Sequence, residues 1–206
     1  MDLWSVFQKG GPIMWPLLLT SLISLAVVLE RLFFIVREQR SRRPAVIADV
    51  LLKVEQEKLP DAIAAGEQSD DFVVRTLVHG LKHRDSGLAN ALLQSANQEL
   101  RRFSQGLTVL DTAITLAPLL GLLGTVSGMI RSFGLLGSAE LSAPTVITGG
   151  IAEALIATAA GLGIAIVALI PFNYLNARLE MARHEIEDAS TRLELLLLRQ
   201  AERKPT

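Results

Sequence analysis

Three long stretches without charged side chains constrain this chain of 206 residues more than any other feature. The first runs from Gly10 to Leu29, the second from Thr112 to Ile130, and the third from Ala154 to Ala177. A helix of about 20 apolar residues crosses the hydrocarbon core of a bilayer. We therefore predict an all-α integral membrane protein whose three transmembrane helices span residues 13–35, 111–134 and 146–174.

The first stretch differs from a cleaved signal peptide, in which basic residues precede a shorter apolar core. Here only Lys9 precedes the apolar residues. The basic residues follow them instead, at Arg31, Arg37, Arg40, Arg42 and Arg43. We therefore expect the segment to be retained as a transmembrane helix.

The positions of the basic residues predict the orientation in the membrane. Of the 20 Lys and Arg residues, all but Lys9 and Arg131 lie within 31–102 or from Arg178 onward. Loops rich in Lys and Arg stay on the cytoplasmic side. This rule places residues 1–12 and the loop 135–145 in the periplasm. It places 36–110 and 175–206 in the cytoplasm of a multi-pass inner-membrane protein.

The cytoplasmic segments are predicted to be helical. Helices are expected from Pro44 to Lys58, around 61–65 and over 72–83, with a turn at Ser86-Gly87. Apolar residues then recur at steps of three and four, which indicates a helix that runs on into the second transmembrane span: Leu88, Leu92, Ala96, Leu100, Phe103, Leu107 and Leu110. The same spacing continues the third span inward, and we expect the two long extensions to pack as a bundle: Leu179, Ala182, Ile186, Ala189, Leu193 and Leu196.

Several classes of function are disfavoured by the composition. The 20 basic and 21 acidic residues nearly cancel, which argues against a nucleic-acid partner. The absence of cysteine excludes thiol catalysis and iron–sulfur clusters. His79 and His83 have the spacing of metal ligands, but no metalloprotease Glu follows the first of them, and no third ligand is evident. We expect no metal, no cofactor and no enzymatic activity.

Glu153 is the one carboxylate well inside a predicted span. Ionisable side chains at this depth are costly and often belong to ion or proton pathways. If the second and third spans form an antiparallel hairpin with its turn near residue 141, Arg131 and Glu153 lie at nearly equal depth. Glu153 therefore has two readings, an ion-conducting group or half of a structural ion pair.

The same hairpin places Thr125 and Thr158 at one level, deeper in the membrane. Four residues of the second span recur every seven positions as a polar stripe, with Thr115 beside them: Asp111, Pro118, Thr125 and Ser132. The threonine hydroxyls are expected either to bond a neighbouring helix or to line a hydrated path next to an acidic group. Pro118 removes one backbone donor and loosens the helix locally.

Small residues are dense on both of these spans: Gly121, Gly124, Gly128, Ala157, Ala159, Ala160, Gly161, Gly163 and Ala165. In lipid, small residues let helix backbones approach closely and pack by van der Waals contact. A subunit of three spans offers few places to bury so much small surface. We therefore expect a homo-oligomer whose packed helices surround a central space.

Two long motifs resemble a known family. Residues 116–130 read LAPLLGLLGTVSGMI and residues 150–164 read GIAEALIATAAGLGI. Both are similar to the second- and third-helix signatures of the ExbB/TolQ/MotA proton-channel family, and three spans fit its ExbB and TolQ branches. Ser127 is a departure, because many relatives carry Trp there, and Arg131 has no assigned family role.

The resemblance implies a motor subunit driven by the proton motive force. Five copies would surround a single-span dimer similar to ExbD or TolR, and a TonB- or TolA-like protein would receive the output. The carboxylate and the two threonines that match the family's proton route are Glu153, Thr125 and Thr158. Asp111, Thr115, Pro118, Arg131 and Ser132 are further candidates for pore or partner contacts. The partner helix is expected to supply an Asp near the threonines.

Two other function classes are weighed against the motor. One is a passive membrane scaffold in which Glu153 only pairs with Arg131. The other is a membrane-embedded enzyme, which would need a nucleophile or metal constellation that the sequence does not contain. The output process stays open between TonB-linked uptake, Tol-type envelope maintenance and gliding-type movement.

Overall fold

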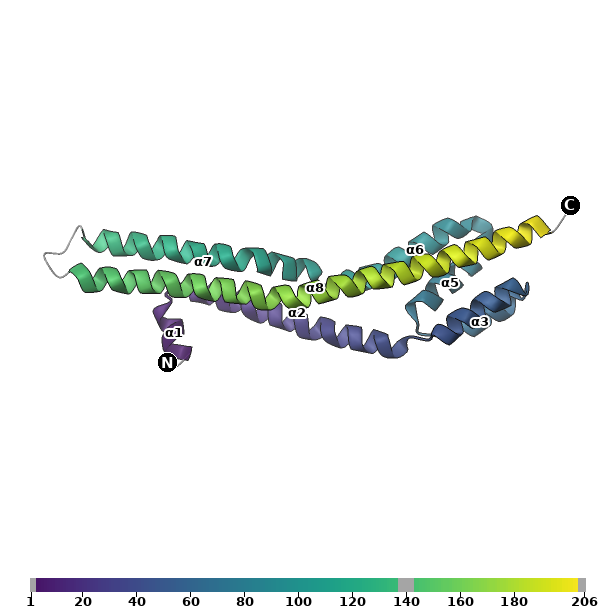
Figure 1. Ribbon diagram of the computed structural model, residues 1–206, viewed down its shortest axis with the longest axis horizontal. Helices are drawn as coiled ribbons and strands as arrows, with labels where there is room; N and C mark the ends of the chain where they lie inside the picture. Colours follow the sequence, from purple (N-terminus) through teal and green to yellow (C-terminus); the bar gives the residue numbers. More distant parts are fainter. Residues whose placement is uncertain (1–2, 137–142, 204–206) are drawn as a thin grey trace. The chain divides into compact units, whose positions relative to one another are not determined.

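The protein is all-α in a computed structural model that describes residues 3–136 and 143–203. The chain order of the helices is α1 (Leu3–Lys9), α2 (Met14–Ser41), α3 (Pro44–Glu55), α4 (Leu59–Glu67), α5 (Phe72–Lys82), α6 (Arg84–Ser104), α7 (Leu107–Leu136) and α8 (Ala143–Arg203). Of the predicted loop 135–145, residues 137–142 lie outside the described residues. Figure 1 shows α7 and the first part of α8 running antiparallel beside each other.

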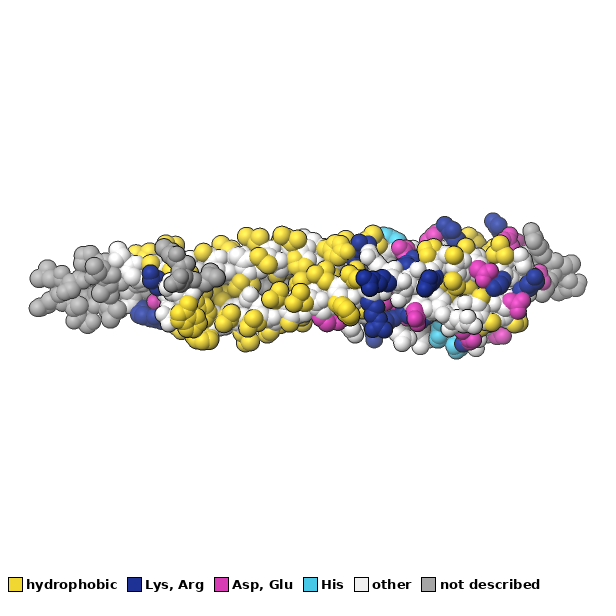
Figure 2. All heavy atoms as spheres, turned by 90° about the horizontal axis from the view of Figure 1, so that it is seen from below, with side chains coloured by type: hydrophobic (Ala, Val, Ile, Leu, Met, Phe, Trp, Pro, Cys, Tyr) yellow, Lys and Arg dark blue, Asp and Glu magenta, His cyan; other side chains and the backbone are white. Residues whose placement is uncertain are grey.

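The chain divides into two compact units. The first, here called the apolar unit, comprises Met1–Glu30 and Gly106–Tyr174. The second, the polar unit, comprises Arg31–Gln105 and Leu175–Thr206. On the face drawn in Figure 2, hydrophobic side chains predominate over charged ones on the apolar unit, whereas Lys, Arg, Asp and Glu side chains gather on the polar unit.

Three helices are long and apolar enough to cross a membrane. They are Met14–Ser41, Leu107–Gly134 and Thr148–Glu202. Each overlaps nearly all of one predicted span, in agreement with the predicted all-α membrane class. Most large apolar side chains of these helices are exposed in the single chain, as in Phe33 (73%) and Val167 (71%). Such exposure suits lipid or a neighbouring helix and does not suit water.

The apolar unit has a small core around Met14, Leu17 and Ala117. Apolar residues of α1, α7 and α8 pack against it: Phe7, Ile13, Leu120, Ile156, Ala160 and Ile164. Residues 1–12 were expected only as a short terminal segment. They contain α1, whose Phe7 packs edge-on against Trp15 of α2 with ring centroids 5.1 Å apart.

The polar unit is built from α3, α4, α5 and α6 with the ends of α2 and α8. The predicted helix from Pro44 ends at Glu55, and Leu59-Pro60 opens α4, where proline suits the first turn. Buried Asp71 caps α5 by accepting a hydrogen bond from the Val73 N–H at 2.9 Å. The expected helices therefore build this unit much as the sequence indicates.

One predicted connection is wrong. The apolar stripe from Leu88 to Leu110 was expected to form one helix into the second span, but α6 ends at Ser104 and α7 begins at Leu107. Gly106 has φ +76°, a left-handed conformation that glycine adopts without steric cost. A glycine in this conformation interrupts the helix although the spacing of the apolar residues continues across it.

The predicted continuation of the third span beyond residue 174 is present, because α8 runs on as one helix to Arg203. On α8 the side chains of Ala182, Ile186, Ala189 and Leu193 are buried in the polar unit at steps of three and four. The Gln200 side chain donates a hydrogen bond to the Val54 carbonyl of α3. Arg42, at the end of α2, forms ion pairs with Asp71 and with Glu185 of α8.

Candidate functional site

The candidate site lies on the α7–α8 hairpin of the apolar unit, where the two backbones touch. A Cβ added to Gly161 would lie 2.4 Å from the Ala117 carbonyl oxygen, and one at Gly121 would lie 3.0 Å from the Thr158 Cα. A Cβ added to Gly128 would likewise lie 3.1 Å from the Gly150 carbonyl oxygen. These small residues, already noted in the sequence, thus allow α7 and α8 to approach until their main chains are in contact.

Thr158 uses this close approach. Its hydroxyl donates a 3.0 Å hydrogen bond to the Gly121 carbonyl of α7. The hydroxyl of Thr125 instead donates to the Leu122 carbonyl of its own helix, at 2.6 Å. The two threonines therefore have different local partners. Thr158 bonds a neighbouring helix, which is one of the two roles expected for these hydroxyls.

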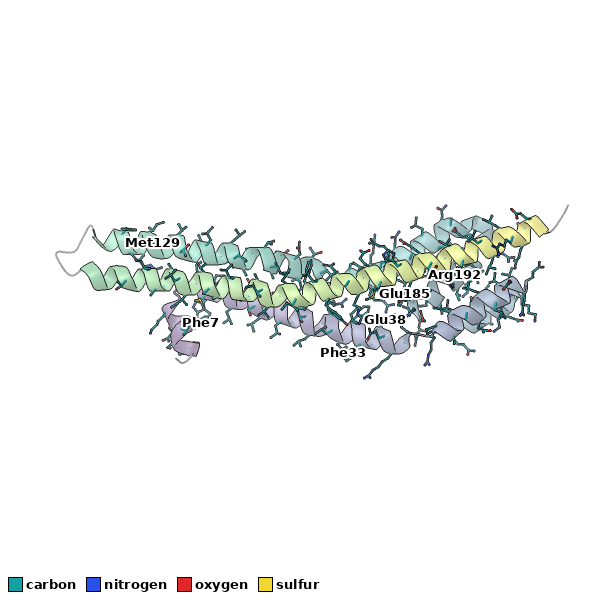
Figure 3. All side chains as sticks on the ribbon, in the orientation of Figure 1. Phe7, Phe33, Glu38, Met129, Glu185 and Arg192 are labelled. Carbon is teal, nitrogen blue, oxygen red and sulfur yellow. The ribbon has the colours of Figure 1, made fainter. Side chains whose placement is uncertain are left out.

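Thr125 lies beside exposed apolar residues of α7. It lines one hollow with Val126, Met129, Ile130 and Phe133, of which Ile130 is 68% exposed. Met129 of this hollow is labelled in Figure 3. A hydroxyl at the edge of an apolar surface can contact a helix from another chain.

Arg131 and Glu153 meet across the hairpin. The guanidinium Nη1 of Arg131 lies 2.9 Å from Glu153 Oε1, with side-chain exposures of 51% and 21%. The partner that the hairpin argument selected is therefore in place. Glu153 keeps a part of its surface open, so the carboxylate is both paired and reachable.

The other stripe residues of α7 do not share one environment. Asp111 and Thr115 are exposed, Pro118 is half-buried within the helix, and Ser132 is 2% exposed. The Ser132 hydroxyl donates to the Gly128 carbonyl at 2.9 Å, and its oxygen lies where a Gly150 side chain would begin. A seven-residue repeat drifts by about 20° per repeat around a straight helix, which turns Ser132 toward α8.

The sequence reasoning missed one neighbour of the site. Gly11, in the turn between α1 and α2, lies directly against the Glu153 side chain. The signal that could have located a tight turn is the Gly10-Gly11-Pro12 sequence just before the first span. Within the described residues no group of three His, Cys, Asp or Glu side chains is placed to hold a metal.

Comparison with known proteins agrees with the two motifs. Residues 65–188 match the sequence model of the MotA/TolQ/ExbB proton channel family. The chain belongs to this family. The match includes α7, which carries Thr125, and the part of α8 that carries Glu153 and Thr158. It confirms the resemblance seen in the two motifs.

Named relatives place the chain near the ExbB and TolQ members of the family. It is 39% identical over 180 residues to the protein named ExbB-like 1 of Synechocystis sp., covering 82% of this chain and 68% of that protein. It is 28% identical over 222 aligned positions to the biopolymer transport protein ExbB of Neisseria meningitidis, covering 97% and 99%. With TolQ of Pseudomonas aeruginosa it shares 40% identity over 95 residues, covering 46% and 41%.

Membership of the family and the three apolar helices together make this chain a multi-pass membrane protein of a proton-channel family. The ExbB relative of Neisseria matches almost end to end, whereas the TolQ match covers less than half of the chain. The family thus accounts for the general class of the chain.

Proposed function

We propose that this chain is the proton-channel subunit of an inner-membrane motor of the ExbB/TolQ type. The observation that carries the proposal is Glu153, a paired but accessible carboxylate in a segment, 141–177, that has no other charged residue. An ionisable group kept at this depth is expensive, which favours a functional reason for its presence. Thr125 and Thr158, on the same hairpin, supply the hydroxyls of the proposed proton route.

The driving force is electrical as well as chemical. Each elementary charge that crosses a membrane potential of 100 mV releases about 2.3 kcal/mol. A proton moving inward would bind a carboxylate on a helix of an ExbD/TolR-like partner and neutralise it, which changes the contacts that this helix prefers. Glu153 and the two hydroxyls would guide the proton and its water, and the partner would pass the work to a TonB- or TolA-like protein.

The proposed orientation follows from charge. Apart from Lys9 and Arg131, every Lys and Arg lies in the segments of the polar unit, 31–105 and 175–206. The positive-inside rule favours the cytoplasm for these segments. The N-terminus and the connection between α7 and α8 would then face the periplasm.

The proposed assembly is a homopentamer around two partner helices. Gly149 and Gly163 of α8 have no atom within 4 Å of the position of an added Cβ. Small residues on such open helix surfaces leave room for the close approach of a helix from another subunit. Gly163 also lines a hollow with Ser21 and Ser24 of α2.

A passive scaffold is the second candidate, and the Arg131–Glu153 pair is the observation that favours it. Removing one partner of a buried ion pair is costly, whereas replacing both by apolar residues is often neutral. The double variant Arg131→Leu with Glu153→Leu therefore separates the two functions. A scaffold keeps its output because no charge is left unpaired, whereas a proton channel has lost its carboxylate.

We expect the double variant to assemble and to lose proton-driven output. The measurement is the proton-dependent work of the output system per assembled complex, with native mass spectrometry of the gently solubilised complex reporting assembly. The single variant Arg131→Leu is the control for the arginine. Normal output from the assembled double variant would establish the scaffold, and a stable monomer or dimer with partner bound would contradict the ring.

A further inference from the structure

The turn between α1 and α2 contacts the Glu153 carboxyl through Gly11. A Cβ at Gly11 would lie 1.9 Å from Glu153 Oε1 and 2.6 Å from its Cδ, far inside van der Waals contact. Gly11 also has φ +74°, a conformation that other residues rarely adopt. A side chain at this position would therefore have to displace the Glu153 carboxyl and adopt an unfavourable backbone conformation.

Hydrogen bonds and core packing anchor both flanks of the turn in the apolar unit. The Gly10 N–H donates to the Val6 carbonyl at 3.0 Å, and the Met14 N–H donates to the Gly11 carbonyl at 3.1 Å. Met14 is buried in the core of the apolar unit, where Phe7 of α1, labelled in Figure 3, packs against the same cluster. Because both flanks are anchored, the turn cannot withdraw from Glu153 without disturbing this core.

The Glu153 side chain consequently lies between Arg131 of α7 and the turn at Gly11. Arg131 of α7 approaches Oε1 to 2.9 Å, and the main chain of Gly11 contacts the carboxyl group as well. Only 21% of the Glu153 side chain is left exposed. The arginine supplies charge and a hydrogen bond, whereas the turn supplies only shape, so the turn limits the orientations open to the carboxyl.

We propose that Gly11 is a positioning residue for Glu153, whose turn closes one side of the carboxyl and keeps it directed toward Arg131. The inference rests on the proposed proton-channel function of Glu153. It adds that α1 and the Gly10–Gly11 turn are part of the proton site, and that water or a partner helix reaches the carboxyl only from its remaining exposed side. A side chain at position 11 would push the carboxyl off this line.

A stability cycle on the purified complex tests the contact without reference to proton transport. Gly11→Ala is measured in the wild-type background and in Glu153→Ala, where the Cγ, Cδ and carboxyl oxygens are absent. We expect the melting temperature to fall by several degrees in the first background and by clearly less in the second, because neighbours in contact are not additive. Equal falls in both backgrounds would overturn the contact.

A functional series tests the positioning. Gly11→Ala and Gly11→Asn are each expected to lower proton-dependent output at least about five-fold per assembled complex, as small misplacements of catalytic groups do. Asn tolerates positive φ, so recovery of output in Gly11→Asn would assign the loss to backbone strain and overturn the proposal. Gly134→Ala of α7 is the control, because its added Cβ meets no atom within 4 Å and the residue lies outside the proposed proton site, so output is expected to stay near that of the wild type.

The outcomes separate this inference from the proposed function. If Glu153→Gln itself keeps full output, the proton-channel role of Glu153 fails, whatever the stability cycle shows. If Glu153→Gln is inactive while the Gly11 variants assemble and work normally, the proton role stands and the positioning role of Gly11 is overturned. Coupling in the cycle together with loss of output in both Gly11 variants supports the proposal.

Discussion

At the residue scale, Thr125 and Thr158 have the same side chain but different hydrogen-bond partners. The Thr158 hydroxyl joins α8 to the Gly121 carbonyl of α7, whereas the Thr125 hydroxyl returns to its own helix beside an exposed apolar surface. A Thr-to-Val change preserves the shape and removes only the hydroxyl. The two positions therefore offer a comparison in which packing and proton conduction predict different results.

Thr158→Val is expected to lose an interhelical hydrogen bond and about 0.5–1.5 kcal/mol of stability, whereas Thr125→Val should lose much less. Both variants should assemble near wild-type yield and sharply reduce proton-dependent output, if the hydroxyls belong to the proton route. The measurements are the yield of the complex, its melting temperature and the output per complex.

Thr20→Val of α2 is the control for this pair. The Thr20 hydroxyl bonds the Pro16 carbonyl of its own helix at 2.8 Å, which resembles the local bond of Thr125. We expect its effect on output to be mild. Normal output from both Thr125→Val and Thr158→Val would make the two hydroxyls packing groups and would refute the assigned route.

At the scale of the elements, the α7–α8 hairpin depends on glycines that differ in what surrounds them. Gly161 and Gly163 lie close together on α8, yet an added Cβ at Gly161 meets the Ala117 carbonyl oxygen at 2.4 Å, while one at Gly163 meets nothing within 4 Å. Alanine is the better helix former by about 1 kcal/mol, so any loss on substitution reflects the neighbours and not the helix itself.

Gly161→Ala is therefore expected to push α7 and α8 apart and to cost about 1–3 kcal/mol of overpacking. Gly163→Ala should leave the fold of the single chain intact and weaken only the proposed ring. Thermal unfolding reports the first effect, and native mass spectrometry reports the second. Equal melting temperatures for the two variants would contradict the close approach at Gly161.

The elements also show what the sequence could predict. Absence of charge and steps of three and four residues indicate the spans and the buried face of α8, because burial in lipid or in a helix bundle acts on those patterns directly. The break at Gly106 and the contact of Gly11 with Glu153 depend on backbone conformation at single glycines, which periodicity does not record. The pairing of Arg131 with Glu153 follows from their similar numbers of residues from the turn, because two antiparallel helices have the same rise per residue.

On the scale of the whole molecule, two glutamates and two arginines of the polar unit form a network of ion pairs. Glu99 accepts hydrogen bonds from Arg75 at 2.7 and 2.9 Å and from Arg102 at 2.7 Å. Glu38, labelled in Figure 3, lies 3.5 Å from the same Arg75 and 3.9 Å from Arg102. Both carboxylates are about nine-tenths buried, but Glu38 Oε1 has no hydrogen-bond partner among the described residues.

The two carboxylates should therefore respond differently to loss of charge. Burial alone would raise the pKa of Glu99, but the hydrogen bonds and charges of Arg75 and Arg102 outweigh burial and lower it. The hydrogen bond to Glu99 raises the pKa of Arg75 in return. A carboxylate whose pKa is lower in the folded state adds stability above its unfolded pKa and loses that contribution as the pH falls through the folded value.

Glu99→Gln is consequently expected to cost about 2–4 kcal/mol at pH 7, because it leaves two partly buried guanidinium groups without their shared carboxylate. Glu38→Gln should change stability by less than about 1 kcal/mol, since the desolvation of this charge is not repaid by hydrogen bonds. The difference between wild type and Glu99→Gln should shrink from about pH 4.3 downward, where the unfolded Glu takes up a proton. Denaturation of the solubilised complex between pH 7 and pH 3 measures both effects. Equal losses for the two variants, or a Glu99→Gln loss that does not vary with pH, would show that the arginines bind neither carboxylate preferentially.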